Sequence, residues 1–380
     1  MQPWQLIQGD CLQVLATLPA ESVQTCITSP PYWGLRDYGT AAWEGGDPVC
    51  SHRVPATGST QNKGNNNREG TPFATVCGKC GATRIDNQLG LEATPEAYVA
   101  SMVAVFREVR RVLRDDGTLW LNLGDSYYSS TATQGRNETK ATGLANGWTG
   151  EKVGASSFVR RIPWLKPKDL VGIPWRVAFA LQADGWYLRQ DIIWHKPNPM
   201  PESVRDRCTK AHEYVFLLTK SERYFYDAEA VSEDGAWCGK QLGIVRGKKV
   251  RAESIGKKPS GNEKPGADAL APDRRNRRSV WTITTKPFSG AHFAVMPPDL
   301  VEPCIKAGCP EGGTVLDPFS GAATVGLVAN QQGCRYVGVE LNQEYCAMSV
   351  RRMESELSQP RLPGMEPQSV QRQAELWEEE

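Results

Sequence analysis

The sequence predicts an α/β protein built around a parallel sheet. This prediction rests on strand and helix patterns near the two ends of the chain. Near the N-terminus, an alternating strand at 4–7 is followed by helix-spaced leucines and a second strand at 23–28. Near the C-terminus, a strand at 314–316 leads through a glycine turn into a helix at 323–332 and a strand at 336–339. Strand–helix–strand units of this kind place their strands side by side in one sheet.

The elements between the two ends follow from the same patterns. A helix is expected to start at Thr94 and Pro95, because Thr is a favoured cap and Pro fits the first turn. Its apolar side chains recur every three or four residues until Asp116 and Gly117, and a buried strand at 118–123 follows. The remaining predicted elements are a helix at about 170–181, strands at 191–194, 213–218 and 223–226, and a helix at 298–307.

Polar and glycine-rich stretches interrupt this α/β core. The predicted core comprises 1–35, 93–228 and 286–357, with a mobile loop near 129–160. The other predicted parts are an insertion at 36–92, a basic region at 229–285 and a polar tail at 358–380.

Composition excludes several classes of protein. With 380 residues and a formal charge of +1, the chain can bury a large core and has no overall charge bias. No apolar run approaches the about 20 residues that cross a bilayer, so no membrane association is expected. Most of the eleven cysteines stand singly in apolar segments, which is typical of reduced thiols, and we expect a cytoplasmic location.

A short motif, Thr28 to Trp33, follows the strand at 23–28. The Ser29 hydroxyl and the Pro30 carbonyl are acceptors for the N–H groups of an exocyclic amine, and Tyr32 can stack on the ring that carries the amine. Taken alone, the same residues also describe a strand that ends in a Pro-Pro turn. Only a second motif can decide between these interpretations.

The second motif begins at Asp317, between the strand at 314–316 and the following helix. It has the sequence D-P-F-S-G and ends at Gly321, where Rossmann-like folds bring the backbone close to a nucleotide cofactor. Glu340 lies at the end of the next strand, about twenty residues later, where an acid can bind both hydroxyls of a ribose. The pairing of turn and acid predicts a cofactor site.

Together these motifs resemble those of the amino-directed DNA methyltransferases that depend on S-adenosylmethionine. In their permuted (beta) group the catalytic motif precedes the cofactor motif, as it does here. The catalytic motif, which resembles the family's (D/N/S)PP(Y/F) signature, comprises Ser29, Pro30, Pro31 and Tyr32. The resemblance implies a Rossmann-like class I methyltransferase fold, circularly permuted. It also implies that S-adenosyl-L-methionine is bound by Asp10, Asp317, Phe319, Gly321, Thr324 and Glu340. The chain departs from the family's G-x-G at one point, where it has Gly321-Ala322-Ala323.

A target-base pocket is implied by the same resemblance. The segment at 194–198 is similar to the family's W-x-K-x-N sequence, and the implied pocket residues are Trp33, Trp194, Lys196 and Asn198. The base would be flipped out of the duplex. Family experience associates Ser29 more with cytosine N4 and an aspartate there with adenine N6, so we expect cytosine, with adenine as the alternative. A zinc-bearing DNA-binding protein with a decayed core and an RNA or protein methyltransferase remain further alternatives.

Four residues of the insertion predict a structural zinc site. Cys50, His52, Cys77 and Cys80 supply three thiols and an imidazole, and C-x-x-C-G is a typical metal-binding turn. Four protein ligands leave no open position for catalysis. A redox pair at C-x-x-C and a chance cluster at the surface are the alternatives.

The stretch 240–278 contains twelve Lys or Arg and four Asp or Glu. It is either a solvated loop or, as the family resemblance implies, the target-recognition region, with phosphate contacts expected from Arg274, Arg275, Arg277 and Arg278. The expected partner is double-stranded DNA. A companion restriction endonuclease in a bacterium and a solitary phage or prophage enzyme are both compatible with the sequence, as are a monomer and a homodimer.

Overall fold

The structure is a computed structural model that describes residues 3–34, 41–52, 76–86, 88–128, 162–234, 274–286 and 295–358. The chain divides into two compact units, one of 1–225 with 279–380 and one of 226–278. The loop predicted at 129–160 lies outside the described residues, as do 240–273 of the basic stretch and 359–380 of the tail. Within the described part, no helix is both long and apolar enough to cross a membrane.

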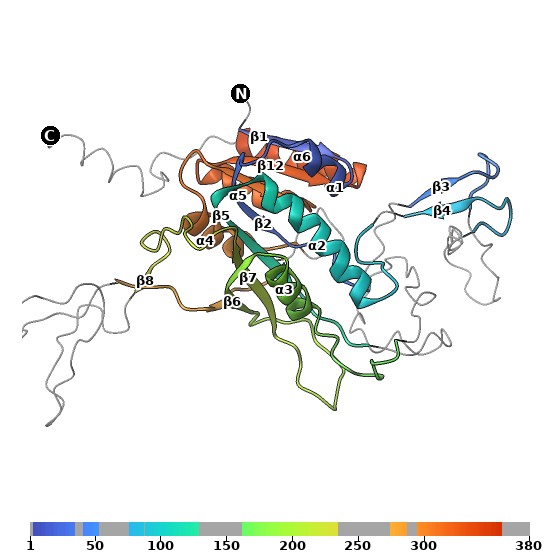
Figure 1. Cartoon of the computed structure of the whole chain (residues 1–380), viewed down its shortest axis with the longest axis horizontal. Helices are drawn as coiled ribbons and strands as arrows, with labels where there is room; N and C mark the ends of the chain where they lie inside the picture. Colours follow the sequence, from blue (N-terminus) through green and yellow to red (C-terminus); the bar gives the residue numbers. More distant parts are fainter. Residues whose placement is uncertain are drawn as a thin grey trace, which may run out of the picture. The chain divides into compact units, whose positions relative to one another are not determined.

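An eight-stranded sheet forms the centre of the first unit (Figure 1). Its order is β1-β12-β11-β2-β5-β7-β6-β10. The strands are β1 (Trp4–Gln8), β2 (Val23–Thr28), β5 (Leu113–Leu123), β6 (Tyr187–His195), β7 (His212–Thr219), β10 (Val280–Thr282), β11 (Thr314–Asp317) and β12 (Arg335–Glu340). Neighbours pair in parallel, except that β7 runs antiparallel to both β5 and β6.

This strand order brings the two ends of the chain together. β2 pairs with β11, with Thr25 opposite Val315, and β1 pairs with β12. At the end of the β2–β11 pair, the Thr28 hydroxyl donates a hydrogen bond of 2.6 Å to Asp317. The two motifs therefore follow adjacent parallel strands at the carboxyl edge, where sheets of this type bind ligands.

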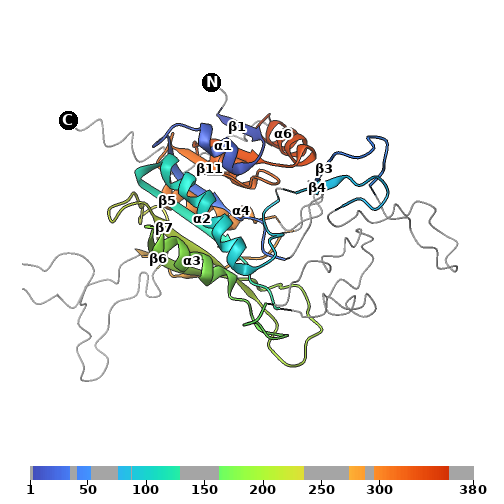
Figure 2. The same ribbon diagram turned by 45° about the vertical axis from the view of Figure 1, so that its right-hand side comes forward.

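Helices cover both faces of the sheet (Figure 2). On one face α1 (Cys11–Thr17), α2 (Pro95–Val112) and α3 (Ile173–Ala183) pack in a row. The other face carries α4 (Pro298–Gly308), α5 (Thr324–Gln331) and α6 (Gln343–Ser358). α2 starts as predicted, since the Thr94 hydroxyl accepts a bond from the Ala97 N–H, and its apolar stripe, including Tyr98 and Phe106, is fully buried.

Some predicted elements differ from the structure. The strand expected at 223–226 is wrong: these residues form a bend and irregular backbone, and the Phe225 N–H donates one backbone bond to the Asp116 carbonyl without forming a strand pair. β5 starts at Leu113 rather than at 118, and α6 was not expected. Within the insertion, β3 (Ala42–Glu44) and β4 (Thr83–Ile85) form a short antiparallel hairpin of their own.

The second unit contains a two-stranded antiparallel ribbon, β8 (Glu233–Asp234) and β9 (Arg274–Arg275). Three of the four arginines predicted to contact phosphates make bonds inside this unit. Arg275 and Arg278 both pair with Glu233, at 3.0 and 2.6 Å, and Arg274 donates to Ser232. β10, which falls in the predicted basic region, belongs instead to the main sheet.

Candidate active site

A cavity of about 980 Å³ opens at the carboxyl edge of the sheet. This volume is at the upper end for small-molecule sites and is large enough for a cofactor and a second ligand. Residues at or just after the carboxyl ends of five strands line it. They are Asp10 after β1, Ser29 to Tyr32 after β2, Asn122, Gly124 and Asp125 at the end of β5, Asp317 to Gly321 at the end of β11, and Glu340 ending β12.

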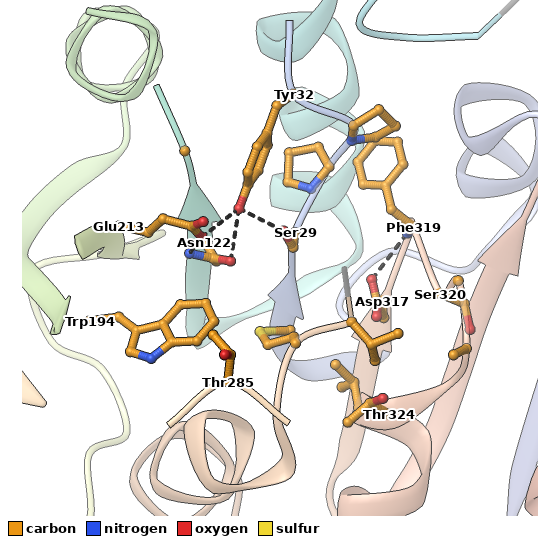
Figure 3. Close-up of a pocket in the computed structure, with 18 of the residues that line it drawn as sticks. Ser29, Tyr32, Asn122, Trp194, Glu213, Thr285, Asp317, Phe319, Ser320 and Thr324 are labelled. Atoms are coloured by element: carbon orange, nitrogen blue, oxygen red, sulfur yellow. Dashed lines mark hydrogen bonds between the residues drawn. The ribbon is translucent and has the colours of Figure 1, made fainter. Parts of the chain in front are cut away.

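The Tyr32 hydroxyl is the centre of a hydrogen-bonded cluster on one side of the cavity (Figure 3). It lies 2.8 Å from the Glu213 carboxylate, to which it donates, and 3.0 Å from the Asn122 side-chain oxygen. The Asn122 amide in turn donates to Glu213 and to the Tyr214 carbonyl. Burial and the nearby Glu213 charge raise the pKa of Tyr32, so the phenol keeps its proton and remains a donor.

The backbone around Tyr32 leaves two acceptors facing the cavity. The Ser29 hydroxyl donates to the Tyr32 oxygen at 3.3 Å, so its own lone pairs remain available. The Tyr98 hydroxyl donates to the Pro31 carbonyl at 2.9 Å, whereas the Pro30 carbonyl accepts no bond from any described residue. Both Ser29 and Pro30 line the cavity beside the Tyr32 ring. These are the acceptors that an amine with two N–H groups requires.

The Tyr32 ring packs directly on the backbone of Gly124. A Cβ atom at this glycine would lie 2.5 Å from Cε2 of the ring, which no structure tolerates without movement. Gly124 therefore has a steric reason for lacking a side chain, since its φ lies outside the left-handed region. The ring is fixed by its hydroxyl at one end and by this close contact on one face.

A second wall on the Tyr32 side of the cavity comes from β6 and the segment after β10. Lys196 forms an ion pair with Glu213 and lies 4.2 Å from the centre of the Trp194 ring. Asn198 exchanges two bonds with the backbone of Thr285, accepting at 3.0 Å and donating at 3.2 Å. Asn198 thus joins the segment after β6 to the segment after β10. Lys196 is bonded to the Tyr32 cluster through Glu213.

The opposite side of the cavity is the turn after β11, and Asp317 is its central acid. Its carboxylate accepts bonds from the Thr28 hydroxyl at 2.6 Å and the Phe319 N–H at 3.1 Å, and the residue is 3% exposed. The pKa of Asp317 is raised to about 7, mainly because the carboxyl group is buried. The negative charge of Glu340 also raises this pKa, whereas the bonds from Thr28 and Phe319 lower it. A buried acid with so high a pKa suits a site that receives a cation.

Glu340 holds the same turn from the neighbouring strand. One carboxylate oxygen accepts the Gly321 N–H at 2.9 Å and the other accepts the Asn342 N–H at 2.8 Å. Each oxygen keeps a further lone pair toward the cavity. Burial raises the pKa of Glu340 despite these bonds, because a carboxylate loses more solvation than they restore.

The departure from G-x-G has a structural explanation. Ala323 adopts a left-handed conformation with φ of 53°, which normally favours glycine, and it is fully buried at the start of α5. α6 supports the turn from behind: the Ser349 hydroxyl donates to the Gly321 carbonyl at 2.6 Å, and Arg352 donates to the Ala322 carbonyl and the Thr324 hydroxyl. These bonds help maintain a turn that its own sequence disfavours.

The structure gathers nearly all of the predicted catalytic, cofactor-binding and base-pocket residues at this cavity, whereas the predicted metal ligands and DNA-binding arginines lie outside its lining. The lining includes Asp10, Ser29, Pro30, Pro31, Tyr32, Trp194, Lys196, Asn198, Asp317, Phe319, Gly321, Thr324 and Glu340. Trp33 is the exception, because it is buried outside the lining and its indole N–H donates to the Glu92 carbonyl at 2.9 Å. Asn122 and Glu213 also line the cavity and were not predicted from the sequence. The one available signal was a polar residue, Asn122, inside the apolar run of β5.

The family model for DNA methylases of the N6/N4 type matches residues 23–351, which include both motifs. The chain belongs to the N6/N4 DNA methylase family. This is a family of DNA methyltransferases that depend on S-adenosylmethionine, and most of the residues that line the cavity lie within the matched range.

Several type II methyltransferases are similar to this DNA methylase over most of its length. M.Cfr9I of Citrobacter freundii is 42% identical, with 92% of this chain and 88% of the relative covered. M.XycI of Xanthomonas campestris pv. cyanopsidis is 41% identical, covering 93% and 88%. M.SmaI of Serratia marcescens is 38% identical, covering 92% and 90%.

Two solved structures share the fold of this DNA methylase. PvuII DNA methyltransferase, described as cytosine-N4-specific, superposes with a TM-score of 0.52 at 17% identity, covering 92% of this chain and 86% of its own. A DNA modification methylase of Thermus thermophilus, TTHA0409, solved with S-adenosyl-L-methionine, has a TM-score of 0.50 at 19% identity, covering 95% of each chain. At these identities the likeness shows the fold alone.

Proposed function

We propose that this protein transfers a methyl group from S-adenosyl-L-methionine to N4 of a cytosine flipped out of double-stranded DNA. The observation that carries the proposal is the pair of acceptors at Ser29 and Pro30, which face one cavity between a fixed Tyr32 ring and the acidic turn after β11. We also propose that the chain is a circular permutation of the usual class I order, because the strands that bear Asp317 and Glu340 come last in sequence.

The acidic side of the cavity fits S-adenosylmethionine. The cofactor carries two cationic groups, a ribose and an adenine, and Asp317, Glu340 and Asp10 place three carboxyl groups along this side. Glu340 would accept bonds from the ribose hydroxyls, and Asp317 would face positive charge. Apolar side chains such as Phe319 and Val339 complete the lining for the flat base. When bound, the cofactor supplies an electrophilic methyl group.

The residues on the opposite side would act by positioning. An aromatic amine is a weak nucleophile because its lone pair is delocalised into the ring. Ser29 and the Pro30 carbonyl would accept its two N–H groups and turn the lone pair toward the methyl group, while Tyr32 stacks on the base for about 1–3 kcal/mol. The extra proton leaves the amine after transfer, so no residue has to remove it beforehand. No metal takes part in this step.

The preference for cytosine rests on Ser29 and on Lys196. Serine at the first motif position accepts an N–H without bringing a charge. Cytosine also presents a carbonyl oxygen two ring positions from its amine, where adenine has a C–H group, and Lys196 is a donor on that wall. The adenine amine would be held by the same two acceptors, and adenine N6 is therefore the second candidate.

The test is to incubate the purified protein with labelled S-adenosylmethionine and duplex DNA of mixed sequence, and to identify the modified nucleoside by mass spectrometry. We expect N4-methylcytosine. N6-methyladenine alone would make the base assignment wrong while keeping the enzyme class. Transfer to RNA or protein, and none to DNA, would contradict the proposed substrate.

DNA methylated in this assay can also be used to test for a companion endonuclease. If a companion endonuclease exists, the site modified in vitro should be protected from it, and the mapped recognition sequence would allow that comparison. Base flipping is expected to appear as a rise in fluorescence when 2-aminopurine replaces the base next to the target. An unchanged signal with active protein would contradict flipping.

A further inference from the structure

Outside the cavity, the side chains of Cys50, His52, Cys77 and Cys80 form a cluster of four possible metal ligands. Their ligand atoms all lie within 4.8 Å of one another. The Cys50 and Cys77 sulfurs are 3.7 Å apart, and the Cys80 sulfur is 3.4 Å from Nδ1 of His52. A tetrahedral zinc site requires sulfur–sulfur edges of about 3.8 Å and sulfur–nitrogen edges of about 3.6 Å, given Zn–S and Zn–N bonds of about 2.3 and 2.05 Å.

The backbone around the cluster is shaped to bring these four groups together. Cys77 and Gly81 form the hydrogen-bonded turn of a C-x-x-C-G knuckle, with the Gly81 N–H donating to the Cys77 carbonyl at 2.8 Å. A Cβ atom on Gly46 would lie 2.8 Å from the Cys80 sulfur, so only glycine leaves room for the sulfur there. The His52 ring is held by stacking on Trp43, with ring centres 4.7 Å apart.

The hairpin that carries the ligands has little else to stabilise it. β3 and β4 are three residues each, and among the described residues their pairing extends only by one bridge, between Thr83 and Val76. A two-stranded hairpin of this length is not stable alone in water. Thiolate and imidazole ligands in tetrahedral geometry are the set that selects zinc, and four protein ligands leave no position for a substrate.

The chain after β4 connects this hairpin to the catalytic cavity. Asp86 links the two regions by accepting from the Arg84 side chain at 2.8 Å and from the Gln88 N–H at 3.2 Å. Gln88 and the next residue, Leu89, line the cavity. Gly90 then contacts the catalytic motif: its carbonyl accepts the Gly34 N–H at 2.8 Å, and a Cβ atom here would lie 3.0 Å from the Tyr32 carbonyl.

We propose that Cys50, His52, Cys77 and Cys80 bind one zinc ion, which orders the β3–β4 hairpin and thereby holds Gln88 and Leu89 in the wall of the cavity. The ion is structural. The expected effect on DNA rests on the proposed function, which assigns Tyr32 to the target base, and Gly90 beside this wall contacts the Tyr32 carbonyl. Loss of the ion should weaken the use of DNA and leave the acidic cofactor side unchanged, because that turn is held by β12 and α6.

Metal content of the full-length protein tests the site directly. Purified without chelator, the wild type should contain about one equivalent of zinc by plasma mass spectrometry. Cys77→Ser and His52→Ala should lose it, whereas His52→Cys should retain it as a four-thiolate site. Cys208→Ser is the matched control, because Cys208 is exposed and outside the cluster. Wild-type protein without zinc, or with iron in its place, would overturn the assignment whatever the enzyme does.

Binding and kinetics test the link to the cavity. Cys77→Ser should raise the KM for DNA about tenfold or more and leave the Kd for S-adenosylhomocysteine within about twofold of wild type. His52→Cys should restore the KM, which separates loss of the ion from a poorly folded variant. If zinc is lost and the KM for DNA is unchanged, the link is wrong. If wild-type protein holds zinc but methylates no DNA, the proposed function fails and the metal site stands.

Discussion

The two sides of the cavity are held together in different ways. On the target side, Tyr32 after β2, Asn122 of β5 and Glu213 of β7 bond side chain to side chain. On the cofactor side, Glu340 and Asp317 bond mainly to backbone N–H groups, those of Phe319, Gly321 and Asn342. Substituting one side chain on the target side should therefore also displace the side chains bonded to it. On the cofactor side, a substitution at one acid should affect only the bonds of that acid.

The largest effect is expected from Tyr32→Ala. Removing the ring abolishes stacking and the anchor at Asn122 and Glu213, so we expect kcat to fall about 100-fold or more. Tyr32→Phe keeps the ring and loses only the hydroxyl bonds, which should cost about tenfold. Single-turnover rates with matched cofactor titrations check both. A Kd for S-adenosylhomocysteine that changes as much as kcat would contradict the separation of the two sides.

Glu340→Ala should show the opposite pattern. A charged hydrogen bond contributes about 1.5–3 kcal/mol, so the cofactor Kd should rise about 10- to 100-fold while kcat at saturating cofactor changes little. Calorimetric titration with S-adenosylhomocysteine measures this. Glu340→Gln, which keeps the shape and the acceptor oxygen for Gly321, should lose less. A Glu340→Gln variant that binds as tightly as wild type would mean that the charge has no role.

Gly124→Ala tests whether the target side is coupled through the Tyr32 ring. The added methyl group would lie 2.5 Å from the ring, which must move. We expect about a tenfold loss in kcat with unchanged cofactor binding. A double-mutant cycle supplies the control: in the Tyr32→Ala background the same substitution should cost almost nothing more. An additive loss would show that Gly124 acts by another route.

The same contrast explains what the sequence could and could not predict. Asp317 to Gly321 and Ser29 to Tyr32 are contiguous motifs, and the chain order of strands and helices followed from periodicity. Asn122 and Glu213 meet only because β5 pairs with β7, with Asn122 opposite Val215, and that register is not visible in the sequence. Local patterns therefore predicted the residues that line the acidic turn, whereas Asn122 and Glu213 beside Tyr32 could not be predicted from them.

At two further places, Trp33 and the β3–β4 hairpin, the structure differs from the prediction for a local physical reason. Trp33 stands next to Tyr32 and was assigned to the base pocket, but successive residues after the strand point in different directions and its indole bonds to Glu92. The β3–β4 hairpin was missed because its three-residue strands carry no detectable alternation. Its cysteines were found, since metal-ligand spacing does not depend on secondary structure.

A moderate effect of pH is expected on the cofactor side. The folded-state pKa of Asp317, about 7, lies above its ordinary value of 3.8, and burial also raises the pKa of Glu340. Without ligand, the folded state therefore binds more protons than the unfolded state, and stability should fall as pH rises from about 4 to 7. A cationic ligand favours the ionised acids, so cofactor affinity should rise up to about tenfold from pH 6 to pH 8.

Calorimetry in buffers of different ionisation enthalpy checks the pH prediction by counting protons released on binding near pH 7. Asp317→Asn should flatten both the stability and the affinity profiles. Tyr32→Phe, on the other side of the cavity, should leave the affinity profile unchanged. Proton uptake on binding, or an affinity that falls between pH 6 and pH 8, would contradict the assignment of Asp317 to a cationic part of the ligand.

The smallest effect is expected at Ala323. A left-handed conformation costs a non-glycine residue about 1–2 kcal/mol, and glycine loses about 0.5–1 kcal/mol more on folding than alanine. Ala323→Gly should therefore stabilise the free protein by up to about 1 kcal/mol, measured by chemical denaturation. Ala322→Gly is the matched control, because Ala322 is equally buried and its φ is not positive, so the same change should destabilise there. If both substitutions destabilise the protein, the prediction for Ala323 is wrong. The left-handed conformation would then cost less than expected in a turn that Ser349 and Arg352 hold in place.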